Sequence, residues 1–201
     1  GNEYTAFGTA IHNVCEKKLL KEQINDEEFF VSNFSDSIAA LDSDVVVDRR
    51  LVDKMVGQGK AILPEIEDAL TAYFGSDYEV MSTEEKLMVP IEEAQYNFKG
   101  FIDAVIKTSD GKYHIVDWKS CSWGWDMKKR TDPMITYQLT LYKKYYAIKH
   151  NINPDIIETH FALLKRTSKK GRVEIFRVSS GNRKTNNASN LLMKAIKNIS
   201  N

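Results

Sequence analysis

The sequence has few cysteines and no long hydrophobic run. Cys15 and Cys121 are its only cysteines, so nothing suggests a disulfide framework. No apolar run approaches the roughly 18 residues of a membrane span, and no signal peptide is visible in this chain. We therefore expect a protein without a membrane partner, in a reducing, cytoplasmic setting.

Internal repeats, low-complexity linkers and a net charge are also missing. The 201 residues suffice for one domain with a full core, and 42% hydrophobic with 28% charged residues is ordinary for a globular chain. We expect a single domain over residues 1–201. The chain begins at Gly1 rather than at a methionine, which leaves open whether the native start lies upstream.

The zero net charge hides an uneven distribution. Residues 1–118 carry 11 Lys and Arg against 23 Asp and Glu, whereas residues 119–201 carry 17 against 5. A basic C-terminal half suggests a polyanionic partner. The alternative is that the two halves interleave in space and their charges alternate over the surface, and charge alone does not decide between these readings.

Hydrophobic periodicity predicts an α/β (α+β) fold. Helical patterns cover residues 5–22, 133–150 and 187–199, and residues 36–74 hold two more, the second from Val52 to Phe74 with Pro64 inside it. Short apolar runs between turn signals predict a three-strand meander over residues 86–120 and two further strands over residues 156–165 and 172–179. This order predicts a central mixed β-sheet flanked by helices, with an acidic helical insertion at about residues 24–80.

Two aspartates of the meander can meet across neighbouring strands. Asp103 and Asp117 are 14 residues apart, on either side of the turn that contains Asp110 and Gly111. Two carboxylates that lie side by side on neighbouring strands repel each other unless a divalent cation lies between them. Hard oxygen ligands suit Mg²⁺ or Mn²⁺, and a further imidazole from His12 would favour Mn²⁺.

Lys119 shares a strand face with Asp117, because side chains alternate between the two faces along a strand. Its ammonium group could orient an attacking water or stabilise charge that develops on a phosphate. A plain ion pair between Asp117 and Lys119 is the alternative.

Four motifs resemble, in chain order, those of the PD-(D/E)XK nucleases, in particular the RecB-like exonuclease branch with its phage and bacterial exonucleases. They match the GxxxH helix, the Gly-x-x-Asp strand, the (D/E)xK strand and the QxxxY helix of that branch. The resemblance spans about residues 5–146 and implies a restriction-endonuclease-like core. The motifs are GTAIH (Gly8 to His12), GFID (Gly100 to Asp103), VDWKS (Val116 to Ser120) and QLTLY (Gln138 to Tyr142).

The resemblance implies a phosphodiesterase that uses one or two Mg²⁺ or Mn²⁺ ions. Lys119 would be the catalytic lysine beside the two aspartates, and Gln138 with Tyr142 would contact DNA or brace the site. Glu16 matches a position that is acidic in relatives. It would either bind a second metal ion or support Lys119, and the resemblance does not decide between these two roles. Relatives with an iron–sulfur cluster use four cysteines, so no cluster is expected here. The implied metal ligands are His12, Asp103, Asp117 and the Trp118 carbonyl.

The loop that follows Lys119 mixes aromatic and basic residues. Trp123 and Trp125 could stack on unpaired bases of a single strand. The alternative is that these tryptophans anchor the loop in the core. Cations of the same loop could follow the DNA backbone, namely Lys128, Lys129 and Arg130.

These features predict a DNA exonuclease that acts on single-stranded ends or linear duplex in recombination, repair or phage replication, with a helicase or recombination protein as a possible partner. A structure-specific endonuclease is the alternative enzyme, and a catalytically silent DNA-binding module is the alternative outside the enzymes. Three further histidines show no ligand-like spacing with the motifs, so packing or surface roles are expected for His114, His150 and His160.

Overall fold

The structure, a computed structural model, describes residues 1–92 and 94–200, which form two compact units. The first unit comprises Gly1–Ser76, Trp118–Gly124 and Ala162–Ile175. The second unit comprises Asp77–Asp117, Trp125–Phe161 and Phe176–Asn201. The expectation of a single domain over the whole chain stays a prediction.

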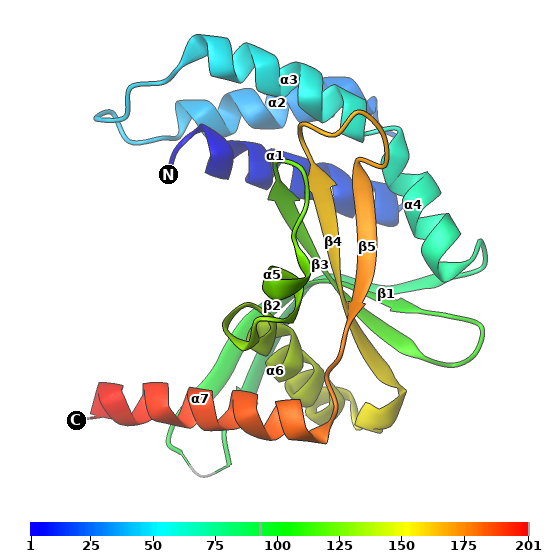
Figure 1. The fold of residues 1–201 in the computed structure, drawn as a ribbon, viewed down its shortest axis with the longest axis vertical. Helices are drawn as coiled ribbons and strands as arrows, with labels where there is room; N and C mark the ends of the chain where they lie inside the picture. Colours follow the sequence, from blue (N-terminus) through cyan, green and yellow to red (C-terminus); the bar gives the residue numbers. More distant parts are fainter. Residues whose placement is uncertain (93, 201) are drawn as a thin grey trace. The chain divides into compact units, whose positions relative to one another are not determined.

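Helices dominate the first unit. The Asn2 side chain begins the first of them by accepting a hydrogen bond from the Thr5 backbone N–H, while the Thr5 hydroxyl is bonded to the Asn2 backbone N–H in return. The rings of Phe7, Phe30 and Phe34 pack together with centroids 5.7–5.9 Å apart and are buried. The helices of this unit are α1 (Glu3–Leu19), α2 (Asp26–Ala39), α3 (Arg49–Ile62) and α4 (Glu65–Phe74), as Figure 1 shows.

The predicted helical insertion holds three helices where two patterns were expected. Helix α2 already begins at Asp26, because the Asn25 side chain accepts the Glu28 backbone N–H and caps it. The prediction of a single helix from Val52 to Phe74 was wrong, since α3 ends at Ile62 and α4 begins at Glu65. Pro64, which has no backbone N–H to donate, stands at the N-cap of α4.

The described strands form one five-stranded sheet in the order β1-β2-β3-β4-β5. Its first three strands confirm the predicted meander. Strand β1 begins before the predicted residue 86, because Glu79 pairs with Lys107 and the hydrogen bonds to β2 extend through a polar stretch. The strands are β1 (Glu79–Pro90), β2 (Asn97–Lys107), β3 (Tyr113–Cys121), β4 (Ile157–Lys165) and β5 (Val173–Val178).

The sheet is mixed, as the sequence predicts. Strands β1, β2 and β3 pair in antiparallel fashion, whereas β3 and β4 point the same way in Figure 1. Parallel neighbours need a crossover connection, and here it contains helix α6 (Pro133–His150). Pro133 occupies the first turn of α6, where its missing N–H costs nothing, and Asn151 ends the helix in the left-handed region with a φ of 52°.

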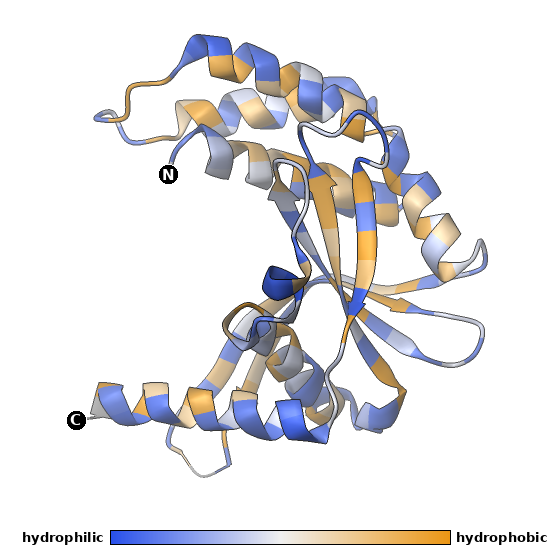
Figure 2. Cartoon of the chain, in the orientation of Figure 1, coloured by the Kyte–Doolittle hydropathy of each residue, from blue (hydrophilic) through white to orange (hydrophobic). Residues whose placement is uncertain are grey.

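Helix α6 contacts β1, β2 and helix α7 (Asn182–Ser200) within the second unit. Hydrophilic and hydrophobic residues alternate along α7 in Figure 2, in agreement with the predicted amphipathic helix at the end of the chain. Two short helices lie in connections, α5 (Met127–Thr131) and η1 (Pro154–Ile156). The sequence predicts a loop over the α5 segment, but the Asp126 side chain accepts the Lys129 N–H and caps a helical turn there.

No helix within residues 1–92 and 94–200 combines the length and the apolar character that crossing a membrane requires.

Candidate active site

Two aspartates face each other across neighbouring strands of the second unit. Strands β2 and β3 pair Ala104 with Val116 and Val105 with Ile115. Continuing this register by one residue sets Asp103 opposite Asp117, the arrangement predicted from their spacing in the sequence. Directly opposed residues of an antiparallel pair have Cβ atoms about 4.5–5.5 Å apart, so this register would bring the two carboxylates close enough to share a ligand.

Helix α6 brings a phenol group to these carboxylates. Tyr142 is buried, and its Oη accepts hydrogen bonds from Gln138 Nε2, at 2.8 Å, and from the Phe101 backbone N–H. Burial, followed by the negative charges of Asp117 and Asp103, raises the pKa of Tyr142 to about 12. Residues of the second, third and fourth motifs therefore meet in one place.

Gly100, the first residue of GFID, makes room for Tyr142. A Cβ atom at this position would lie 2.8 Å from Tyr142 Cε1, closer than real Cβ contacts come. The ring of Tyr142 also lies at an edge-to-face angle to Phe98, with centroids 6.2 Å apart. The glycine of this motif therefore lets the tyrosine ring pack directly onto the β2 backbone.

We predict that Tyr142 stays protonated across the pH range in which nucleases are assayed. Its pKa of about 12 lies well above the ordinary value near 10 for tyrosine. In an Asp103→Asn protein the pKa should fall, since one negative charge is removed, but stay above 10 because burial persists. NMR of ¹³Cζ-labelled tyrosine, assigned with Tyr142→Phe and with circular dichroism as the control for folding, measures both values. An unchanged pKa in the Asp103→Asn protein would contradict the placement.

The first unit holds the other predicted site residues. His12 and Glu16 are four residues apart on α1, so they lie along one face of that helix. Gly8 lies one turn before His12, and a Cβ atom there would come within 3.3 Å of Ser120 Oγ. The small residue at the start of GTAIH therefore lets α1 approach β3 beside Lys119.

Strand β3 carries residues of both units, and the boundary falls between Asp117 and Trp118. The Trp118 side chain is only 2% exposed, whereas Lys119 is half-buried. Because side chains alternate along a strand, Lys119 and Asp117 project from the same face of β3. The predicted site residues thus fall into two groups. Asp103, Asp117, Gln138 and Tyr142 belong to the second unit, and His12, Glu16, Trp118 and Lys119 belong to the first.

The two tryptophans of the basic loop differ in their surroundings. Trp123 is 76% exposed. Trp125 packs edge to face against Phe161, with ring centroids 5.0 Å apart, as the anchoring alternative expects. The cations of α5 gather around it: Lys129 Nζ lies 4.7 Å from the centre of its ring and Arg130 Nε donates to its carbonyl at 2.9 Å.

One polar cluster of the structure was not predicted from the sequence. His114, Glu158 and His160 come together in the second unit, whereas packing or surface roles had been expected for the two histidines. The 43 residues between His114 and Glu158 carry no local signal for this contact. Only the pairing of β3 with β4 brings them side by side.

The sequence matches the PD-(D/E)XK nuclease superfamily over residues 2–199. The chain therefore belongs to this superfamily, a class of hydrolytic nucleases that use divalent metal ions. A comparison with curated proteins gave no match.

One solved structure supports the fold. A protein from Eubacterium rectale, described as "Putative exonuclease", superposes with a TM-score of 0.62 and 12% sequence identity. The match covers 99% of this chain and 66% of that protein, so the chain spans slightly less than two thirds of its length. The structure of SSO0001 matches with a TM-score of 0.44 and 13% identity, over 93% of this chain and 84% of that one.

The donor set at Asp103 and Asp117 suits the metal that the superfamily uses. Opposed carboxylates repel each other, and a divalent cation between them removes that repulsion. Carboxylate oxygens are the ligands that Mg²⁺ and Mn²⁺ prefer in proteins. The residues present therefore fit such an ion.

Proposed function

We propose that this protein is a Mg²⁺- or Mn²⁺-dependent DNA exonuclease of the RecB-like branch. The observation that carries the proposal is the cross-strand pair Asp103 and Asp117 with Tyr142 beside it, in a chain that belongs to a nuclease superfamily. The order of the four motifs supports the branch. A negatively charged substrate also suits the basic C-terminal half of the chain.

The metal would be held by oxygen and imidazole ligands, and one or two ions are compatible with the donors. When bound, it would neutralise charge on the scissile phosphate and promote ionisation of the attacking water. The Lys119 ammonium would stabilise charge that develops on the phosphate. The proposed ligands are His12, Asp103, Asp117 and the Trp118 carbonyl.

Further residues of the four motifs would support the site. The hydrogen bond from Gln138 fixes the phenol group of Tyr142, so this pair would contact the DNA strand or hold the carboxylates in place. Glu16 would lie one helical turn after His12, as a ligand for a second metal or as a partner for Lys119.

The loop with Trp123 and helix α5 would bind a single-stranded end. An exposed indole offers a face on which an unpaired base can stack. Lys128 is also exposed, and Lys129 and Arg130 place two further cations beside Trp125. These cations would follow the phosphates of the same strand.

We predict that Trp123→Ala weakens binding of single-stranded DNA by about 1–3 kcal/mol, roughly 5- to 150-fold in Kd, because one stacked base is lost. The free energy of unfolding should not change, since the side chain is 76% exposed. Fluorescence anisotropy with a labelled oligonucleotide, in an Asp117→Asn background that prevents cleavage, measures Kd. Tyr96→Ala, which removes an exposed aromatic residue outside the loop, is the control. Equal losses for both variants would refute a stacking role for Trp123.

The experiment that tests the proposed activity compares end-labelled linear DNA with covalently closed circular DNA, in Mg²⁺, Mn²⁺ or EDTA. An exonuclease degrades only the linear substrate, and the size of the first labelled product gives its direction. Cleavage of the circle favours the structure-specific endonuclease. Binding without metal-dependent cleavage favours a catalytically silent DNA-binding module.

Several biological assignments remain predictions. They are a role in recombination, repair or phage replication, a helicase or recombination protein as partner, and a cytoplasmic location. Preference for DNA over RNA can be read from the same assay with a labelled RNA of identical sequence.

A further inference from the structure

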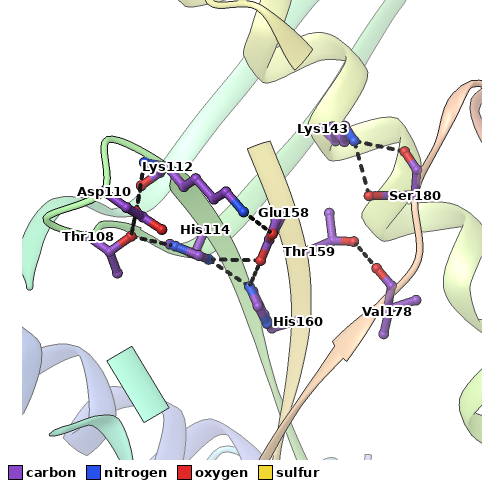
Figure 3. A network of polar contacts seen from close by, with 10 residues as sticks. All are labelled: Thr108, Asp110, Lys112, His114, Lys143, Glu158, Thr159, His160, Val178 and Ser180. Atoms are coloured by element: carbon purple, nitrogen blue, oxygen red, sulfur yellow. Dashed lines mark hydrogen bonds and ion pairs between the residues drawn. The ribbon is translucent and has the colours of Figure 1, made fainter. Parts of the chain in front are cut away.

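Three potential metal-binding side chains converge in the second unit, on strands β3 and β4 (Figure 3). His114 Nδ1 lies 2.9 Å from His160 Nε2 and 3.7 Å from Glu158 Oε2. His160 Nε2 lies 4.0 Å from the same carboxylate oxygen. Two imidazoles and one carboxylate therefore present one ligand atom each to a common point.

The three distances fit one face of a tetrahedral zinc site. Zinc lies about 2.0–2.1 Å from imidazole nitrogen and about 2.0–2.2 Å from carboxylate oxygen, which sets neighbouring ligand atoms roughly 3.3–3.5 Å apart. The observed separations of 2.9, 3.7 and 4.0 Å lie on both sides of that range. Side-chain movements of a few tenths of an ångström would equalise them.

A second set of contacts orients the His114 imidazole for metal binding. The Thr108 hydroxyl donates its one proton to Asp110 Oδ1, at 2.5 Å, so toward His114 Nε2, at 2.9 Å, it acts as an acceptor. His114 therefore carries its proton on Nε2 and directs the Nδ1 lone pair at the cluster. Metal-binding histidines are commonly held by such a bond from their other ring nitrogen.

The remaining two groups are also suited to a cation. The His160 side chain is 1% exposed, and burial lowers its pKa to about 3, so the ring is neutral at neutral pH. Lys112 Nζ pairs with Glu158 Oε1 at 3.1 Å, which leaves Oε2 on the side of the imidazoles. Glu158 is partly exposed, so a water can reach a fourth position.

We propose that His114, Glu158 and His160 form a zinc-class metal site that joins β3 to β4. It is separate from the carboxylate pair, because Asp117 lies three residues after His114 and so on the opposite face of β3. Two nitrogen ligands and one oxygen ligand favour Zn²⁺ over Mg²⁺. On binding, the His160 proton moves from Nε2 to Nδ1, and the ion replaces the hydrogen bond between the two rings.

The test uses the full chain, stripped of metal with a chelator and titrated with Co²⁺ or Zn²⁺. We expect one tetrahedral Co²⁺ spectrum per chain, a rise in Tm with Zn²⁺, and, in an Asp117→Asn background that disables the proposed nuclease site, one bound Zn²⁺ by equilibrium dialysis with elemental analysis. His160→Gln and Glu158→Gln should each weaken binding at least about tenfold. Glu158→Gln is the variant less prone to misfolding, because position 158 is partly exposed.

Two controls make the result specific. His150→Gln removes a histidine of the same unit that bonds a single carboxylate, Glu85 Oε2 at 2.6 Å, and should leave affinity unchanged. Asp117→Asn should also retain the spectrum, since that residue belongs to the proposed nuclease site. A folded wild-type protein that gives no tetrahedral Co²⁺ spectrum overturns the proposal, and so does a tetrahedral spectrum that survives unchanged in Glu158→Gln and His160→Gln. Metal binding without DNA cleavage would sink only the nuclease proposal.

Discussion

Replacing Asp117 with Asn is expected to abolish DNA cleavage while leaving the protein folded. The exchange keeps the shape of the side chain but removes one of two opposed negative charges that would hold the metal. The expected loss of kcat is at least about a thousandfold, or ~4 kcal/mol of transition-state stabilisation. Release of label from end-labelled linear DNA, under single-turnover conditions, measures it.

The matched control is Asp53→Asn, which removes an exposed aspartate of α3 and should keep full activity. Asp103→Asn and Lys119→Met should resemble Asp117→Asn, since each removes a charge from the proposed chemistry. Circular dichroism and thermal unfolding show whether each variant is folded. Turnover near the wild-type rate by a folded, contaminant-free Asp117→Asn protein would end the assignment of Asp117 as a catalytic ligand.

Gly59→Ala is expected to give a large loss of stability in the first unit. A Cβ atom at position 59 of α3 would lie 2.2 Å from Cζ of Phe30, a ring that is fully buried between Phe7 and Phe34. The ring contacts both neighbouring rings, so a shift of Phe30 must disturb the cluster. Overpacking of this kind costs about 1–3 kcal/mol, and we expect the upper end of that range.

Gly57→Ala on the same helix is the matched control. Nothing lies within 4 Å of a Cβ atom at that exposed position, so the substitution should raise the free energy of unfolding by about 0.5–1 kcal/mol through helix propensity. Urea denaturation followed by circular dichroism measures both changes. The same sign for both variants would mean that the packing of α3 on Phe30 differs from that described.

Local sequence signals predicted most of the elements. The alternation of apolar residues around Asp103 and Asp117 gave the meander, and Pro133 with the pattern after it predicted α6. The failures have local causes too. Pro64 divides a continuous helical pattern, and β1 extends to Glu79 because its partner strand, not its own composition, supplies the hydrogen bonds.

The candidate site was predictable in part. The number of residues across one tight turn determines which residues of an antiparallel hairpin oppose each other. The register of β2 and β3 therefore follows from the sequence, and its continuation predicts Asp103 opposite Asp117. The spacing of Gln138 and Tyr142 likewise follows from the helix. The sequence did not predict the contact between Gly100 and the Tyr142 ring, because the two residues belong to separate elements.

The sequence by itself determined the strands and most of the helices, and it predicts the pair of aspartates, since each depends on periodicity or on a short turn. Only the tertiary structure decided that His114 meets Glu158 and His160, because these side chains come together through the pairing of β3 with β4. The connection between β3 and β4 contains α6. Such a long connection does not determine which residues of the two strands pair. The pairing of strands that are far apart in the sequence depends on the packing of the whole sheet, so no single stretch of sequence predicts it.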